Sequence, residues 1–286
     1  MFGMDPLLNM AALLFAGLLF SRLIKLLKLP NVTGFLVGGL IIGPSVLGLL
    51  STQGVESLGL ISSVALGFIA FSIGSEFKIS YFRRVGFLPI VIATFESLFA
   101  VVFVVAALAA AGQTLPFSLV LGAIAAATAP AATIMVIKQY RAKGPVTETL
   151  LSVVALDDAT ALIFFGIAVA IAQALESPQH ASLLFSVLSP VLQILAALGI
   201  GLALGAAHTL LIRFLPARHN RLVLTIAFVL TATAVAELLG LSALLTTMAM
   251  GAVFANFCKQ SAQVMELTDR FTNPIYMMFF VLSGAI

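Results

Sequence analysis

The chain has 286 residues, of which 62% are hydrophobic and only 9% are charged, and its net charge is +3. Soluble domains carry roughly 25% charged residues, so the composition excludes a soluble globular fold and predicts an all-α polytopic membrane protein. The single cysteine, Cys258, excludes a disulfide framework within the chain.

Basic residues mark one end of every predicted span. All fourteen Lys and Arg fall into five clusters, separated by apolar stretches without either residue: Arg22 to Lys28, Lys78 to Arg84, Lys138 to Lys143, Arg213 to Arg221, and Lys259 to Arg270. Cytoplasmic loops of membrane proteins are enriched in Lys and Arg, so we expect every cluster on the cytoplasmic side of the cell membrane and the N-terminus outside. These clusters are short and adjoin spans, so nucleic-acid binding is not indicated.

Apolar runs predict ten helical segments in chain order. They cover residues 6–28, 33–50, 57–76, 87–112, 115–138, 146–175, 183–214, 221–239, 241–257 and 271–286. The second segment is short and rich in glycine, a composition that allows helices to approach closely.

The fifth segment, 115–138, contains a predicted helix break at Ala129 and Pro130. Proline lacks the amide hydrogen and crowds the carbonyl four residues back, so we expect the helix to kink or unwind near Ala126 to Thr128. Free backbone carbonyls inside a membrane are tolerated beside protein or water, which makes a break of this kind a pointer to a transport site. A simple kink without a binding role is the alternative.

Two adjacent carboxylates, Asp157 and Asp158, lie in the apolar sixth segment, 146–175. An aspartate in the middle of a membrane helix costs roughly 2.5 to 3.5 kcal/mol, so a lipid-facing position is disfavoured. We expect the pair to face the protein interior or a wet cavity, where an ionisable group indicates an ion or proton site.

Three polar features share one predicted depth. Counted from the cytoplasmic ends of their segments, Glu96, Pro130 and Asp157 lie nine, eight and eleven residues in. At ~1.5 Å per residue, this is about 12 to 17 Å, near the middle of a ~30 Å hydrocarbon core. The shared depth favours a single site. No basic residue lies in the span of Glu96, which predicts either a carboxylate paired with another helix or a protonated core glutamate.

The chemistry of this site predicts cation and proton exchange. Adjacent helical residues point about 100° apart, so one aspartate is expected to meet the ion and the other a neighbouring helix. The interrupted helix would add carbonyl oxygens and the Thr128 hydroxyl. A proton and a monovalent cation would compete for the same carboxylates, as an antiporter requires. A channel or proton-leak pore, and a non-transporting sensor, stay open as alternatives.

Other polar residues favour structural roles. No metal-ligand His or Cys spacing, phosphate loop or nucleophile triad is present, so neither an enzyme nor a cofactor is expected. His208 is predicted to be a packing residue. Threonines in the later helices can bond to their own backbone, namely Thr231, Thr233, Thr246 and Thr247.

The segment order predicts a single transmembrane transporter domain over 1–286, built from two inverted repeats. Segments one and two share a short cytoplasmic turn, while segments eight and nine share a short external one, as two inverted copies would. We assign residues 1–175 to the first repeat, 176–220 to a linker helix and 221–286 to an incomplete second repeat.

Five motifs in order resemble the monovalent cation/proton antiporters, in particular bacterial Na⁺/H⁺ exchangers with paired aspartates. They are Leu29 to Gly48 (LPNVTGFLVGGLIIGPSVLG), Gly74 to Phe77 (GSEF), Thr128 to Ala131 (TAPA), the Asp157 and Asp158 doublet, and Phe279 to Gly284 (FFVLSG). The resemblance covers essentially the whole chain.

The resemblance implies thirteen helices, a homodimer and elevator-type alternating access. Ten helices are predicted here, so we expect the chain to lack the family's last helices. By resemblance, Asp158 is the main ligand of Na⁺ and the proton, and Asp157 is the second carboxylate. The doublet favours electrogenic Na⁺/H⁺ exchange across the cell membrane, with K⁺/H⁺ exchange as the alternative and Li⁺ as another possible cation.

Overall fold

A computed structural model describes residues 5–77, 79, 86–128, 142–176 and 183–286. Within these residues, the protein contains eleven α-helices and no strand. The helices are α1 (Pro6–Leu26), α2 (Asn31–Ile42), α3 (Thr52–Ser57), α4 (Gly59–Glu76), α6 (Leu88–Ala110), α7 (Leu115–Ala125), α9 (Pro145–Glu176), α10 (Leu183–Ile212), α11 (Arg218–Leu238), α12 (Ala243–Phe257) and α13 (Ser261–Ala285).

The helical order confirms the predicted all-α, polytopic architecture. Apart from the short α3, the helices of the described ranges match the ten predicted segments. Three boundaries differ by more than a few residues: the end of α2, the end of α7 at Ala125 and the start of α13. The second helix ends at Ile42 because Gly43 and Pro44 follow it, so the chain turns there. The last helix begins at Ser261, earlier than predicted, since its first turns are polar and resemble a loop in sequence.

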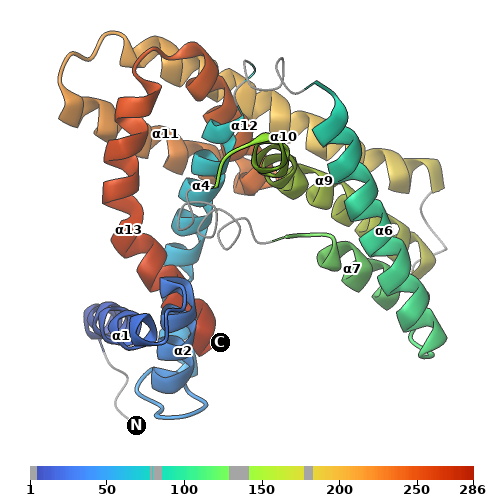
Figure 1. Cartoon of the computed structure of the whole chain (residues 1–286), viewed down its shortest axis with the longest axis horizontal. Coiled ribbons are helices and arrows are strands. Elements are labelled where there is room, and N and C mark those ends of the chain that lie inside the picture. The colour runs from blue at the N-terminus through green and yellow to red at the C-terminus, as the bar shows by residue number, and fades with distance from the viewer. Residues whose placement is uncertain (1–4, 78, 80–85, 129–141, 177–182) are drawn as a thin grey trace.

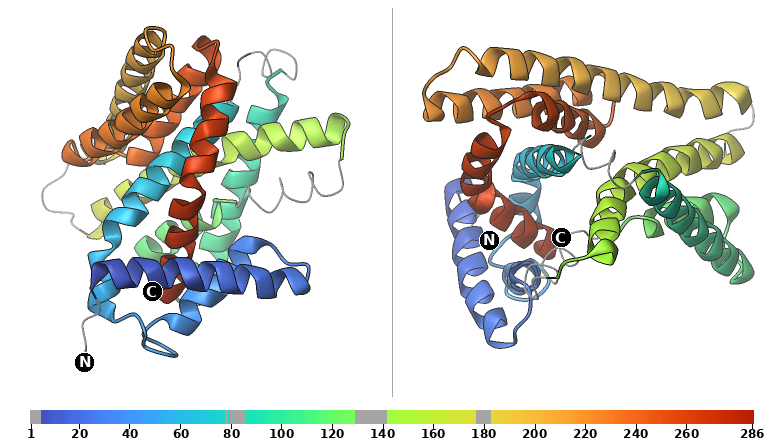
Figure 2. Two further views of the ribbon diagram at one scale, coloured as in Figure 1. Left: turned by 90° about the vertical axis from the view of Figure 1, so that its left-hand side faces the viewer. Right: turned by 45° about the horizontal axis from the view of Figure 1, so that its top comes forward.

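The helices form two packed groups (Figures 1 and 2). One group consists of α6, α7 and α9, which pack extensively on one another. The other consists of α1, α2, α4, α11, α12 and α13, with α4 against α12 and α2 against both α1 and α13. Helix α10 packs on α9 as well as on α11 and α12 and so connects the two groups.

Close helix contacts in the larger group depend on glycine. A Cβ atom at Gly39 of α2 would meet the Val281 carbonyl oxygen of α13, and one at Gly251 of α12 would meet the Phe71 carbonyl oxygen of α4. Any side chain at these positions would push the backbones apart. The glycine-rich composition of α2 therefore serves close packing, as the sequence predicted.

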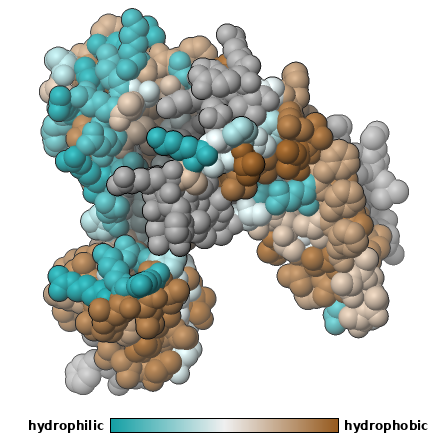
Figure 3. Space-filling model, in the orientation of Figure 1, coloured by the Kyte–Doolittle hydropathy of each residue, from teal (hydrophilic) through white to brown (hydrophobic). Residues whose placement is uncertain are grey.

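The surface is strongly apolar, as a protein embedded in lipid requires. Among the described residues, four helical stretches are long and apolar enough to cross a membrane: α1, α6, residues 192–212 of α10, and α11. In α6, only 11% of the most apolar window is buried inside the protein. Hydrophilic residues gather over the ends of α11 and α13, whereas apolar residues cover much of the surface around α1 and α6 (Figure 3).

Candidate cation site

Helix α7 ends at Ala125, directly before Ala126 to Thr128, where the sequence predicts that the helix kinks or unwinds. The next two amides donate to carbonyls three residues back, at 3.2 and 3.1 Å, so the last turn tightens before the helix stops. Thr128 is no longer helical. The described residues Ala126 to Thr128 are therefore not α-helical, as the prediction of unwinding near them requires, whereas Ala129 and Pro130 themselves lie outside the described residues, so the predicted break stays a prediction.

Asp157 lies on α9 and is 1% exposed. Its Oδ1 atom accepts a hydrogen bond from Ser97 Oγ on α6 at 3.1 Å, and its Oδ2 atom accepts one from the Thr128 hydroxyl beyond α7. A carboxylate is costly to bury unless its oxygens are hydrogen-bonded, and here each of the two oxygens accepts a bond from a hydroxyl. Side chains from α6 and from the segment after α7 thus meet at the Asp157 carboxylate of α9.

A third hydroxyl completes this arrangement. Thr160 Oγ1, one turn further along α9, donates to the Asp157 backbone carbonyl at 2.9 Å and lies 2.9 Å from Ser97 Oγ. Thr160 donates its own proton to that carbonyl, so Ser97 is the donor between the two hydroxyls. The single proton of Ser97 therefore has two acceptors, Asp157 Oδ1 and Thr160 Oγ1. Ser97 can therefore change partner when the charge on Asp157 is neutralised.

Among the described residues, the side chains that bond to Asp157 offer oxygen atoms, and none of them is basic. Within the described ranges, the ion pair present joins Arg270 and Glu266 at 2.6 Å on the exposed face of α13. In that part of the chain, no three His, Cys, Asp or Glu side chains lie close enough together to hold a metal ion. Carboxylate and hydroxyl oxygens suit a hard cation rather than a soft transition metal.

The other predicted site residues have different outcomes. Asp158 is helical in α9, and its side chain lies outside the described residues. Glu96 is exposed on α6 and makes no ion pair within the described ranges, so its predicted pairing stays a prediction. Its neighbour Ser97 is the α6 residue that contacts Asp157.

The sequence analysis missed Ser97 and Thr160. Ser97 directly follows Glu96 and shares its predicted depth, and Thr160 lies three residues after Asp157, on the same helical face. Both signals were present in the sequence. However, sequence position alone does not distinguish a hydroxyl that faces a binding site from one that bonds to a carbonyl of its own helix.

The structural roles predicted for later polar residues are confirmed. His208 is fully buried, stacks on Phe254 with ring centroids 4.4 Å apart, and lies 3.1 Å from Thr225 Oγ1 through Nε2. The remaining threonines donate to carbonyls four residues back in their own helices, namely Thr231, Thr233, Thr246 and Thr247.

Comparison with known proteins gives a family and a fold. A family model described as "Sodium/hydrogen exchanger, transmembrane" matches residues 10–286. A solved structure of the sodium proton antiporter MjNhaP1 from Methanocaldococcus jannaschii is similar with a TM-score of 0.76 and 20% identity, covering 96% of this chain and 68% of that chain. At this identity, the likeness establishes a shared fold. No curated protein sequence matches the chain.

Proposed function

Because the chain belongs to the transmembrane sodium/hydrogen exchanger family, whose model matches residues 10–286, we propose that it exchanges Na⁺ for protons through a site formed by Asp157 and Asp158. Membership makes it a multi-pass membrane transporter rather than an enzyme. We place it in the cell membrane as a homodimer with its N-terminus outside. The observation that carries the site is the buried Asp157 carboxylate, held by hydroxyls from two other segments.

Competition between the two ions follows from the electrostatics of Asp157. A buried carboxylate that has no basic partner among the described residues gains charge compensation from either a cation or a proton. Only one of these can occupy the same oxygens at a time. Asp158 would be the main ligand and Asp157 the second carboxylate, with Thr128 and carbonyls from the break at Ala129 and Pro130 as further oxygen donors.

The two packed groups support an elevator-type step. Helices α6, α7 and α9 carry the site, and their extensive contacts stay within their own group or reach α10. Movement of this group as a unit past the other would expose Asp157 alternately to each side of the membrane. Within the inverted-repeat assignment of 1–175 and 221–286, α10 is the linker between the repeats.

The paired carboxylates favour an electrogenic Na⁺/H⁺ exchanger, with a K⁺/H⁺ exchanger as the alternative. The discriminating experiment is transport by the protein reconstituted in proteoliposomes, measured as current on a solid-supported membrane with Na⁺, Li⁺ or K⁺. We expect Asp158→Asn to abolish the current. Asp157→Asn should reduce it or make exchange electroneutral, because the pair then carries one charge fewer.

Glu237→Gln is the matched control, since Glu237 is exposed at the end of α11, and it should transport like the wild type. Full current in the Asp158→Asn variant would refute the site. Flux that cannot convert a Na⁺ gradient into a pH gradient would instead favour the channel interpretation, and binding without flux would favour the sensor interpretation.

A further inference from the structure

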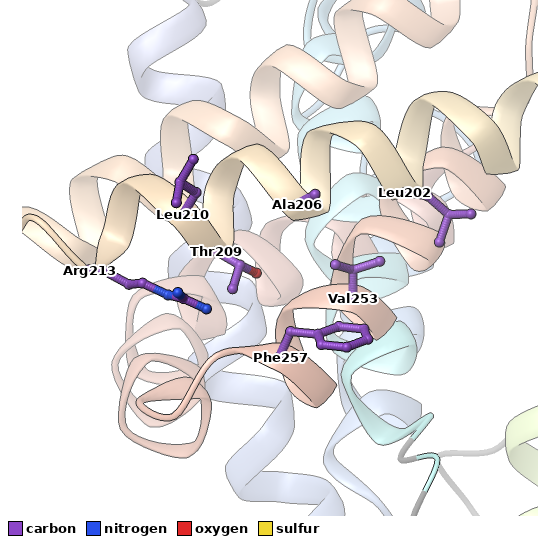
Figure 4. A pocket seen from close by; sticks show the side chains of 7 residues that line it. All are labelled: Leu202, Ala206, Thr209, Leu210, Arg213, Val253 and Phe257. Carbon is purple, nitrogen blue, oxygen red and sulfur yellow. The ribbon is translucent and has the colours of Figure 1, made fainter.

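A groove of about 520 Å³ lies between α10 and α12, away from the carboxylate site (Figure 4). Its apolar walls are formed by Leu202, Ala206 and Leu210 from one helix and by Val253 and Phe257 from the other. The groove is open along one side. Its largest wall residues are highly exposed: Leu202 51%, Leu210 54% and Phe257 61%. Such a surface fits a flexible hydrocarbon chain.

Thr209 lines the groove with a hydroxyl that lacks a partner. The residue is only 4% exposed, and its Oγ1 atom makes no hydrogen bond within the described residues. Threonines elsewhere in the helical core behave differently: Thr225, Thr233 and Thr268 donate to the carbonyl four residues back, at 2.8 to 3.0 Å. The Oγ1 atom is itself enclosed, so it offers no contact to a ligand in the groove, and the polar end of the groove lies at Arg213.

Arg213 closes one end of the groove. Its side chain extends from the end of α10 toward the end of α12 that carries Phe257, and it forms no ion pair in the part of the chain that the structure describes (Figure 4). Positive potential also reaches the adjacent Cys258. Burial raises the pKa of its thiol, and the charges of Arg221 and Arg213 act in the opposite direction. The groove therefore has one cationic end and an apolar body.

We propose that this groove binds an anionic phospholipid, with an acyl chain along α10 and the phosphate at Arg213. From Leu202 to Arg213 the helix rises about 16 Å, at ~1.5 Å per residue, close to the ~15 Å hydrocarbon thickness of one leaflet. A basic residue between membrane helices recognises anionic headgroups by the same chemistry. Because α10 also contacts both helix groups, the lipid would occupy the linker on which their relative position depends.

Native mass spectrometry of the full chain in an uncharged detergent tests this proposal, with phosphatidylglycerol and phosphatidylcholine of identical acyl chains as probes. Phosphatidylglycerol should bind the wild type about tenfold more tightly than phosphatidylcholine. Arg213→Gln should remove this preference, whereas Arg213→Lys should retain most of it. Arg22→Gln, which removes an exposed arginine on α1, is the matched control and should bind like the wild type.

Filling the groove provides an independent variant. Ala206→Phe should weaken both lipids several-fold, while Ala203→Phe, at an exposed α10 position outside the lining, should leave binding unchanged. An unchanged preference in Arg213→Gln overturns the proposal, even if Ala206→Phe fails to fold. Equal competition by free glycerol phosphate also overturns it, because the acyl chain would then contribute nothing. Asp157→Asn should bind lipid normally, so failure of the transport proposal remains distinguishable.

Discussion

Ser97 places one hydroxyl proton between two acceptors, the Asp157 carboxylate and the Thr160 hydroxyl. The hydrogen bond from Ser97 to Asp157 joins α6 to α9, so its strength affects the packing of the two helices. A neutral donor near an ionised carboxylate contributes about 1.5 to 3 kcal/mol. At the residue scale, Ser97 is thus the side chain through which binding at Asp157 can change helix contacts.

We expect Ser97→Ala to weaken the apparent affinity for Na⁺ by roughly tenfold, since the carboxylate loses a donor that organises it for the cation. The measurement is the Na⁺ dependence of transport in proteoliposomes at fixed pH. Thr94→Ala is the control, because that hydroxyl on the same helix bonds to the Ile90 carbonyl at 2.8 Å. Equal KM values for Ser97→Ala and the wild type would contradict the role of Ser97.

At the scale of elements, one side chain fixes the end of α4 to α12. The Asn256 amide donates to the Phe77 carbonyl at 2.5 Å and to the Ala252 carbonyl at 2.7 Å, and its Oδ1 accepts from the Ile79 amide at 2.7 Å. Asparagine supplies the two donors and one acceptor that these backbone groups require. The larger helix group therefore holds the chain just before it leaves toward α6.

Replacing the amide by a carboxylate, Asn256→Asp, removes both donors and sets a charge against two carbonyl oxygens. We expect a loss of about 1 to 3 kcal/mol, seen as a lower Tm of the purified protein. Asn220→Asp introduces the same charge at an exposed position of α11 and should leave the Tm close to that of the wild type. Similar shifts in both variants would assign the effect to net charge instead of the tether.

The α4 and α12 contact also depends on the absence of a side chain at Gly251. A methyl group there would meet the Phe71 carbonyl oxygen, so Gly251→Ala should separate the helices and cost about 1 to 3 kcal/mol. The Tm measured in detergent is the readout. Gly199→Ala on α10 is the control, since its added Cβ would meet nothing within 4 Å. A Gly251→Ala protein as stable as the control would show that the backbones can separate freely.

At the scale of the whole molecule, the described helices of the two groups have few direct contacts with one another, and α10 connects them. The carboxylate site lies entirely in the smaller group, because Ser97, Thr128, Asp157 and Thr160 belong to α6, α9 and the segment after α7. A group of this kind can move as a unit without breaking its own hydrogen bonds. The structure is therefore compatible with the proposed elevator step.

Spin labels test this movement after Cys258→Ser removes the native thiol. A pair at Phe103 on α6 and Leu238 on α11, both exposed, should change its distance distribution by several ångströms between low pH and high pH with Na⁺. A pair at Leu19 and Leu238, within the larger group, should keep one distribution. Unchanged distances in the first pair under all conditions would exclude the elevator step.

The sequence by itself determined the polytopic all-α fold, the end of helical structure ahead of Pro130 and the interior position of Asp157. These features are local: a proline ring disrupts its own helix, and a charge in an apolar span carries a large cost wherever that span packs. Only the tertiary structure decided that Ser97 donates a hydrogen bond to Asp157, that Asn256 secures α4, and that the helices from α1 to α9 divide between two packed groups. Each of these depends on contacts between residues far apart in the chain, and hydrophobic periodicity does not specify which helices become neighbours.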